Sequence, residues 1–391
     1  MAGIFKSVMQ TMDLDKYLDN IKGRKIVIEG TDDNGQMLMK LIEDKGFEVY
    51  SFIDYNSQKQ VDKFINKDVL SAEVLAGNSK DFYIFITGNY EEEKEKYLNE
   101  NGYCELEDYL YILHKPTIVQ NEEEYTDIYG NKIKAPVGTE FKFLGYNSNV
   151  NIDTCIKDKV KISCSGSIVN IGSDCNMAKN ISIDCFGKSE VIIGDECLIG
   201  DSVTISATIN SIINLDPKCK IRNNSLVQSI EESSIKFEKS SFNENTVFFA
   251  KKKSSISIGR GSFSGPRLVC TTYFGGNIKI GADCMFSEYV TLMNNDGHPI
   301  FDIKTGKQIN GSKDIIIGNH VWLGIKTTIL SGTDIGNASI VGANSLVNKK
   351  FSNNCIIAGN PARMIRKDIA WDTEETNSEL IDKSLYWDFT N

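Results

Sequence analysis

Aliphatic residues recur every six positions through the C-terminal half of this chain, and this period constrains its fold more than any other feature. Six of them lie at successive intervals of six: Ile317, Leu323, Ile329, Ile335, Val341 and Val347. The same spacing returns upstream in three triplets: Ile193, Ile199 and Ile205; Leu215, Ile221 and Val227; Ile280, Phe286 and Leu292. Glycine follows four of the first six residues, and glycine permits the sharp turns that so short a repeat needs.

A six-residue unit is long enough for one short strand and a turn. Three such units close a triangular coil, and the aliphatic residue of each points into the prism that the stacked coils form. The period therefore predicts a hexapeptide parallel β-helix over residues 135–365, with at most about a dozen coils. Residues 229–255 lose the period and contain Lys251, Lys252 and Lys253, so we expect distorted coils or a loop there.

The N-terminal region has a different pattern. Short apolar runs at 25–30, 47–53 and 81–86 alternate with helical spacing over 37–46 and an acidic helical segment over 91–99. Strands that alternate with helices indicate parallel crossover units, so residues 22–118 are predicted to form a small Rossmann-like α/β domain. We expect an N-terminal helix over 1–21, a linker over 119–134 and a C-terminal tail over 366–391.

Apolar residues at helical spacing define the expected N-terminal helix: Ile4, Phe5, Val8, Met9 and Met12. Docking onto the body of the protein is favoured. A helix on a membrane surface is the alternative, but the segment lacks the basic face such helices carry.

The first loop of the α/β domain, Gly30-Thr31-Asp32-Asp33-Asn34-Gly35, is where a nucleotide-binding domain would hold a pyrophosphate. It departs from the G-x-G-x-x-G pattern, and its two carboxylates oppose a phosphate group. A structural or recognition role is therefore favoured over dinucleotide binding.

Charge and cysteine usage exclude other classes. The net charge of −10 opposes nucleic-acid binding, which needs a basic surface. The ten cysteines include no C-x-x-C pair, the N-terminus does not resemble a cleavable signal, and no apolar stretch is long enough to span a membrane. The sequence therefore predicts a reduced, cytoplasmic protein without a transmembrane segment.

The chain contains three histidines: His114, His298 and His320. A zinc site of three histidines is disfavoured, because His298 and His320 are 22 positions apart and His114 lies outside the repeats; no metal is expected. His298 lies in a segment from 293 to 313 that interrupts the period, so we expect a projecting loop that presents its imidazole as a general base. His320 occupies a turn of a regular coil and is expected to be structural.

Two polar residues precede His298 in the same loop. Asn295 and Asp296 are candidates for binding the hydroxyl groups of an acceptor. An ordinary Asn-Asp-Gly turn is an equally good explanation of them.

Four blocks in the C-terminal part carry a family resemblance: DGHP at 296–299, IGNHVWLG at 317–324, VGANSLV at 341–347 and AGNPARMIR at 358–366. Their order and spacing resemble the hexapeptide-repeat acetyltransferases, in particular the galactoside, maltose and polysaccharide O-acetyltransferases. The resemblance is close over 278–368, and it implies a left-handed β-helix. The N-terminal domain resembles the small Rossmann-like domain that precedes the acyltransferase domain in some bacterial sugar-modifying enzymes.

The resemblance implies a homotrimer with acetyl-CoA bound in the groove between neighbouring subunits. His298 matches the catalytic base of the family. Five residues match positions near the cofactor: Trp322, Gly324, Ala343, Lys349 and Arg366. Asn348 departs from the family pattern, in which a threonine usually precedes the lysine.

The function that we expect is O-acetylation of a sugar hydroxyl on a bacterial-type surface polysaccharide, such as a capsule, or its precursor. The acetyl group would pass directly from acetyl-CoA, with no covalent intermediate on the enzyme. Two alternatives remain. One is N-acetylation of a nucleotide-linked amino sugar, and the other is a non-catalytic trimeric scaffold that binds carbohydrate.

Overall fold

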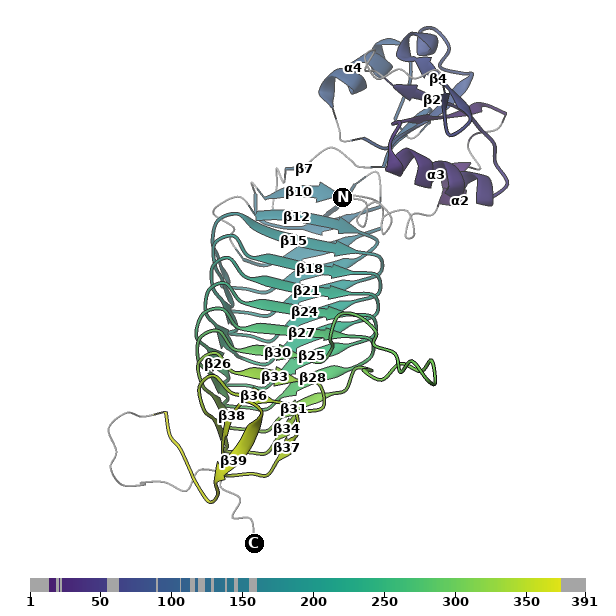
Figure 1. Cartoon of the computed structure of the whole chain (residues 1–391). Coiled ribbons are helices and arrows are strands. Elements are labelled where there is room, and N and C mark those ends of the chain that lie inside the picture. The colour runs from purple at the N-terminus through teal and green to yellow at the C-terminus, as the bar shows by residue number, and fades with distance from the viewer. Residues whose placement is uncertain are drawn as a thin grey trace.

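The computed structural model consists of a small α/β domain followed by a long β-helix (Figure 1). It describes residues 14–18, 21, 23–54, 63–88, 91–105, 107–112, 117–118, 124–127, 130–137, 139–143, 147–154 and 160–373. The apolar residues at 4–12 lie outside the described residues. Within the expected N-terminal helix, α2 (Leu14–Leu18) buries Leu14 and Leu18 against the α/β domain. In the part of the chain that is described, no helix has both the length and the apolar character needed to cross a membrane.

The N-terminal domain is a six-stranded sheet in the order β3-β4-β2-β1-β5-β6. The pairs among β1, β2, β4, β5 and β6 are parallel, and β3 is antiparallel to β4. The predicted Rossmann-like alternation is thus present, with β3, β4 and β6 added to it. The elements are β1 (Lys25–Glu29), α3 (Asp33–Asp44), β2 (Val49–Asp54), β3 (Lys63–Phe64), β4 (Lys67–Ser71), η1 (Ala72–Leu75), β5 (Phe82–Ile86), α4 (Glu92–Glu100) and β6 (Tyr109–Tyr111).

The first loop of this domain uses its own carboxylate to cap α3. The Asp32 side chain accepts hydrogen bonds from the backbone N–H groups of Asn34 and Gly35, each at 3.0 Å. These are amides that a pyrophosphate would otherwise bind. The contact supports the structural interpretation of the loop.

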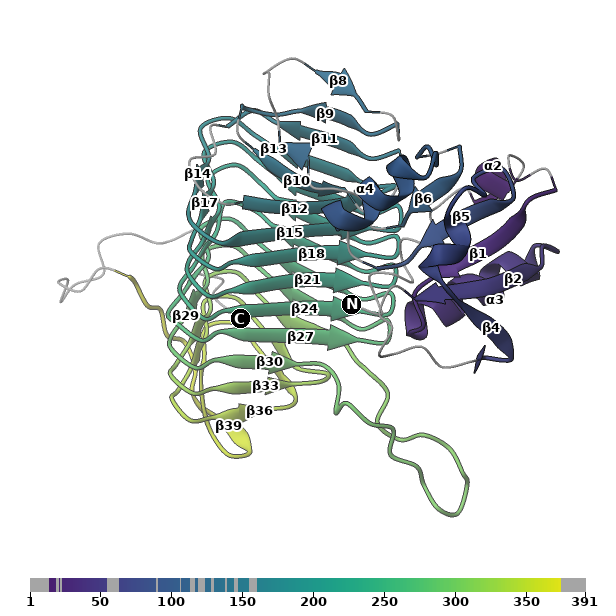
Figure 2. The same cartoon turned by 90° about the horizontal axis from the view of Figure 1, so that it is seen from above.

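Stacked coils form three sheets, parallel except at their end strands, which we call face 1, face 2 and face 3 in the order in which the chain visits them (Figures 1 and 2). Face 1 has 11 strands: β7 (Thr117–Ile118), β10 (Glu140–Phe143), β12 (Val160–Ser165), β15 (Ile181–Phe186), β18 (Thr204–Thr208), β21 (Leu226–Ile230), β24 (Val247–Lys251), β27 (Val269–Tyr273), β30 (Thr291–Met293), β33 (Thr328–Leu330) and β36 (Leu346–Val347).

Face 2 has 12 strands: β8 (Tyr125–Thr126), β9 (Lys132–Lys134), β11 (Asn149–Ile152), β13 (Ile168–Ile171), β16 (Glu190–Ile193), β19 (Ile212–Leu215), β22 (Ser234–Phe237), β25 (Ser255–Ile258), β28 (Asn277–Ile280), β31 (Ile315–Ile317), β34 (Asp334–Ile335) and β37 (Lys350–Phe351). Face 3 has 10: β14 (Asn176–Met177), β17 (Leu198–Ile199), β20 (Lys220–Ile221), β23 (Ser241–Phe242), β26 (Phe263–Ser264), β29 (Met285–Phe286), β32 (Trp322–Leu323), β35 (Ile340–Val341), β38 (Ile356–Gly359) and β39 (Ala362–Arg366). The repeat aliphatics fill the prism, as the period predicts.

Most coils are longer than three units of six. Ile168 pairs with Glu190 and Glu190 with Ile212, a step of 22 residues, whereas Ile316 pairs with Asp334 after 18. The extra residues lengthen the strands of face 1 and the corner that follows them, where pairs such as Ile209 and Asn210 adopt left-handed φ values of 59° and 54°. In the 22-residue coils, two sides therefore keep the six-residue spacing and the third does not.

The segment 229–255 forms regular coils, so the expectation of distorted coils or a loop is wrong. Phe237, Phe242 and Phe248 replace aliphatic residues in the prism, with ring centroids 4.5–4.8 Å apart. Lys252 and Lys253 occupy a corner, and the Lys253 ammonium lies 3.5 Å from Glu232 on the preceding coil. The aromatic core and the longer corner hide the period in the sequence.

Strand pairing of the solenoid begins before residue 135, where the β-helix was expected to start: β7, at the end of the expected α/β domain, pairs with β10 of face 1. Within 119–134, β8 and β9 already join face 2, and β9 pairs in parallel with β11. The α/β domain packs beside the first coils (Figures 1 and 2). Phe186 of β15, fully buried, belongs to the same apolar cluster as Leu14, Tyr17 and Ile112. Face 1 thus supplies part of the core of the N-terminal domain.

Candidate active site

A single long loop leaves the solenoid between β30 and β31, at the corner of face 1 and face 2 (Figure 1). This loop takes the place of the short corner that joins face 1 to face 2 in the other coils, as the interruption of the period predicts. His298 lies on this loop and is exposed. The imidazole is therefore free of the core, and a substrate can reach it.

Asn310 fastens the two arms of the loop together around His298. Its side-chain amide donates hydrogen bonds to the Asp296 carboxylate at 2.9 Å and to the backbone carbonyl oxygen of His298 at 2.8 Å. Its carbonyl oxygen accepts from the backbone N–H of Ile300 at 2.7 Å. An exposed loop thereby acquires a defined course next to the histidine. Sequence reasoning missed this residue, because Asn310-Gly311 is typical of an ordinary turn.

The base of the loop is anchored in the solenoid by Asn294. This residue is fully buried, and its side chain accepts a hydrogen bond of 3.0 Å from the backbone N–H of Tyr273. A Cβ atom at Gly276 would lie 2.2 Å from the Asn294 amide nitrogen, so the close approach requires glycine. The loop therefore begins at a fixed point.

Asn295 and Asp296 lie beside His298 but differ in availability. The Asn295 amide donates to Ser312 at 3.0 Å, and its oxygen accepts from the Gly297 backbone at 2.5 Å. Asp296 is exposed and accepts from Asn310 through one carboxylate oxygen, Oδ2. Asp296 is thus better placed than Asn295 to bind an acceptor hydroxyl.

Trp322, Gly324 and Ala343 form a second group, on face 3 and its corner with face 1. The Trp322 indole N–H donates to Ser287 Oγ at 3.2 Å. A Cβ atom at Gly324 would lie 2.8 Å from the backbone nitrogen of Ala343 on the next coil. The two positions are therefore stacked directly, and glycine at 324 permits this close approach of the two coils.

Arg366 belongs to this second group and Lys349 to the first. On face 3, Trp322 pairs with Ile340, Ile340 with Ile356 and Ile356 with Arg366. These three steps place Arg366 about 14 Å from Trp322 at the usual spacing between strands. Lys349 lies instead at the corner of faces 1 and 2, two coils beyond the His298 loop, with its ammonium 5.6 Å from the Phe351 ring centroid.

The candidate residues thus lie on two edges of one protomer. Asn295, Asp296, His298 and Lys349 lie at the corner between faces 1 and 2, and the cofactor-type residues Trp322, Gly324, Ala343 and Arg366 lie on face 3 and at its corner with face 1. Face 1 separates the two groups. A hollow of about 390 Å³ lies beside the first group, on face 2, where Lys313, Asp314 and Lys350 line it.

His320 has the structural role that its position predicts. Its ring stacks on Trp371 with centroids 4.0 Å apart and planes 8° apart, and its Nε2 lies 2.9 Å from the Trp371 carbonyl oxygen. The Trp371 indole in turn donates to the His320 carbonyl oxygen at 2.9 Å. The tail beyond β39 thereby returns to face 3, with the Trp371 ring 5.9 Å from Trp322. No sequence pattern indicated this contact.

Among the described residues, one group of side chains brings possible metal ligands within 4.8 Å: Cys104, Glu107 and Asp108. It lies in the N-terminal domain, and Asp108 already pairs with Arg24 at 2.6 Å. The group is remote in sequence from the His298 loop, and no metal enters the chemistry below.

Comparison with known proteins gives partial matches. No protein-family model matches the chain. The polysialic acid O-acetyltransferase of Escherichia coli O1:K1 / APEC is 39% identical over 132 residues, 34% of this chain and 42% of that protein. The Neisseria meningitidis polysialic acid O-acetyltransferase is 53% identical over 57 residues, 15% of this chain and 26% of that protein. The chain thus spans less than half the length of these two relatives.

A third relative is matched over most of its length. The Escherichia coli K12 protein named "Putative lipopolysaccharide biosynthesis O-acetyl transferase" is 30% identical over 162 residues, 38% of this chain and 76% of that protein. Among solved structures, a polySia-specific acetyltransferase has 27% identity and a TM-score of 0.42, covering 57% of this chain and 92% of that one. The structure of a polysialic acid O-acetyltransferase has 27% identity and a TM-score of 0.41, covering 57% of this chain and 95% of that one.

Proposed function

The chain belongs to the hexapeptide-repeat acetyltransferases, and we propose that it transfers an acetyl group from acetyl-CoA to a hydroxyl group of an acidic surface polysaccharide or its precursor. The observation that carries the proposal is the His298 loop, which Asn294 and Asn310 hold in a defined course outside the solenoid. The names of the relatives, polysialic acid O-acetyltransferases, support an acidic polysaccharide as the acceptor.

In the proposed reaction, His298 accepts the proton of the acceptor hydroxyl as its oxygen forms the new ester bond. The thioester bond breaks, and His298 returns the proton to the departing CoA sulfur. Asp296 orients the acceptor through its free carboxylate oxygen. Because the transfer is direct, no serine or cysteine nucleophile is needed. The buried thiols of the repeats, such as Cys197 and Cys284, lie inside the prism.

The second group of residues fits the cofactor. Ala343 is exposed on the coil that follows Gly324, so the pantetheine arm can lie along its backbone beside Trp322. Arg366 is exposed and forms no ion pair with any described residue, so its guanidinium is available to the CoA phosphates. Acetyl-CoA supplies the activated acetyl group when bound.

We propose a homotrimer, which the separation of the two groups supports. His298 and Trp322 lie at opposite edges of face 1 in one protomer, so a single copy does not form a groove between them. A neighbouring copy that presents its face 3 edge to the His298 corner would complete the site. Three such contacts close a ring, and closed rings are the usual form of soluble oligomers.

We place the protein in the cytoplasm. The nine described cysteines are all free, and eight of them are buried, which suits a reducing compartment. Acetyl-CoA is then available to the protein as a soluble co-substrate.

Product chemistry tests this proposal. The purified protein is incubated with acetyl-CoA and polysialic acid, a neutral polysaccharide or a nucleotide-linked amino sugar, and free CoA is measured with a thiol reagent. We expect CoA release with polysialic acid and a product whose acetyl group mild base removes, as an ester requires. A base-stable acetyl group on the amino sugar would favour the N-acetyltransferase, and absence of acetyl-CoA binding would favour the scaffold.

A further inference from the structure

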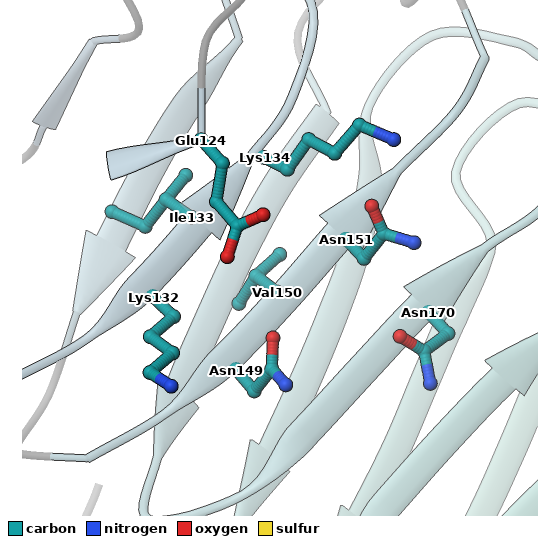
Figure 3. A pocket seen from close by; sticks show the side chains of 8 residues that line it. All are labelled: Glu124, Lys132, Ile133, Lys134, Asn149, Val150, Asn151 and Asn170. Carbon is teal, nitrogen blue, oxygen red and sulfur yellow. The ribbon is translucent and has the colours of Figure 1, made fainter. Parts of the chain in front are cut away.

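A polar hollow of about 310 Å³ lies on the outer surface of face 2, at the end of the solenoid farthest from the His298 loop. Strands β9, β11 and β13 form its floor, and Glu124 extends over it (Figure 3). Seven strand steps separate β11 from β31, where the His298 loop returns. At the usual spacing between strands, this separation is about 34 Å.

Several polar groups in this hollow have no partner within the part of the chain that the structure describes. Lys132, Asn149 and Asn170 form no side-chain hydrogen bond or ion pair with any described residue. The Asn151 carbonyl oxygen Oδ1 is buried and accepts no hydrogen bond. A buried acceptor without a donor is unfavourable, and this residue lines the hollow that a ligand would enter.

The chemistry of the lining selects the ligand class. Side-chain amides donate and accept at once, which suits the hydroxyl groups of sugars, and an ammonium pairs with a carboxylate. Figure 3 shows the side chains of Lys132, Asn149 and Asn170 standing off the strands around the hollow. Among the described residues that line the hollow none is aromatic, and aromatic rings are the usual platforms for the bases of a single-stranded nucleic acid. An acidic saccharide fits these groups when its carboxylate pairs with Lys132 and its hydroxyl groups face Glu124 and the amides.

Face 2 connects the hollow to the His298 loop. The outward row that starts at Asn151 runs in register through polar residues at five of its seven remaining positions: Asn170, Ile192, Asn214, Lys236, Ser257, Lys279 and Ile316. It ends at the second hollow, beside Lys313 and Asp314. A flexible polysaccharide can therefore follow one polar surface between the two hollows.

We propose that the hollow over β9, β11 and β13 is a second saccharide-binding site, which holds a distal segment of an acidic polysaccharide while another segment of the same molecule reaches His298. This inference rests on the proposed function. It makes the enzyme selective for long acceptors, because a short saccharide cannot occupy both places. Binding at the second site raises the effective concentration of acceptor near the loop.

The test compares two matched double variants. Lys132→Ala with Asn170→Ala removes an ammonium and an amide from the hollow. Lys220→Ala with Asn176→Ala removes the same groups from exposed outward positions on face 3 and serves as the control. All four side chains project outward from the strands of the solenoid. Melting curves check that both variants are folded.

Long polysialic acid is titrated into each protein without acetyl-CoA, by calorimetry, and disialic acid is titrated in parallel. We expect affinity for the polymer to fall at least about thirtyfold in the hollow variant, as loss of a charged and a neutral hydrogen bond implies. The control variant should bind like the wild type. If transfer occurs, KM for the polymer should rise by the same factor while kcat and the KM for disialic acid stay unchanged.

Binding separates this inference from the proposed function, since it is measured without catalysis. A wild-type protein that does not bind polysialic acid would overturn the second site. Equal affinity of the hollow variant and the wild type would overturn it too. The wild type could bind the polymer without transferring acetyl groups to it, while the hollow variant alone loses binding. That result would retain the second site and reject the proposed acceptor reaction.

Discussion

The side-chain amide of Asn310 donates a hydrogen bond of 2.8 Å to the backbone carbonyl oxygen of His298, twelve positions earlier in the same loop. The same amide donates to the Asp296 carboxylate at 2.9 Å. One uncharged side chain thus holds the backbone of His298, the proposed base, and the carboxylate of Asp296, the residue proposed to bind the acceptor. The loop is exposed, so these contacts replace the packing that orders a buried site.

Replacement of Asn310 should lower the rate and leave cofactor binding intact. We expect Asn310→Ala to reduce kcat about tenfold, because a base held less firmly spends less time in the reactive geometry. The KM for acetyl-CoA and the shape of the pH–rate profile should not change, since His298 itself remains. Lys304→Ala, at an exposed position of the same loop that does not contact His298, is the control. Equal rates for the two variants would show that Asn310 does not position the base.

Inactive variants should complement each other if the site is shared between copies. His298→Ala and Trp322→Ala remove residues at opposite edges of face 1. In co-expressed mixed trimers, a site is intact when Trp322→Ala supplies its His298 and His298→Ala supplies its Trp322. With equal amounts of the two variants, about one quarter of the sites are intact, which gives about one quarter of the wild-type activity. Each variant alone should be nearly inactive. A mixture no more active than its separate components would mean that one protomer carries the whole site.

The buried ion pair of the N-terminal domain gives a prediction on stability. The Lys94 ammonium lies 2.8 Å from Glu29 Oε1, and the Glu29 side chain is 7% exposed. Burial raises the pKa of Glu29, although Lys94 opposes the shift. The native state therefore binds the Glu29 proton more tightly than the unfolded chain does. The contribution of this group to the stability of the protein is lost as the pH rises through the raised pKa.

Removal of Lys94 leaves that carboxylate without its partner. We expect Lys94→Ala to lower the free energy of unfolding of the N-terminal domain by about 3 kcal/mol at pH 7.5 and by less at pH 5, where protonation of Glu29 is easier. Denaturant titration at the two pH values measures the difference. Lys96→Ala on the same helix, whose side chain is 73% exposed, should have little effect at either pH. A loss that is the same at both pH values for Lys94→Ala would contradict the buried-charge explanation.

The repeats were predictable because each coil places its aliphatic residues at a fixed interval against the same residues of the next coil. The interval fails where the core is built differently. Phe237, Phe242 and Phe248 fill the prism of the coils at 229–255 with aromatic rings, and the longer corner after face 1 adds residues that a search for units of six does not expect. The strands at 125–134 were missed because they are only two and three residues long and carry no aliphatic residues at the six-residue interval.

The chemistry-bearing histidine could be found from the interruption of the period, but its support could not. Asn310 contacts His298 only after the loop has closed, and Trp371 reaches His320 across 51 positions of sequence. Neither contact follows a local pattern. The same holds for the hollow on face 2, which depends on the register of three coils rather than on any motif.

The most direct test of the account is the rate of acetyl transfer by His298→Ala, measured with saturating acetyl-CoA and polysialic acid as both CoA release and base-labile acetyl groups on the polymer. We expect a variant that folds, binds CoA like the wild type and transfers acetyl groups roughly 10²–10⁴-fold more slowly, the usual contribution of a positioned base. A variant within a few-fold of the wild-type rate would contradict the assignment of His298 and, with it, the active site described here.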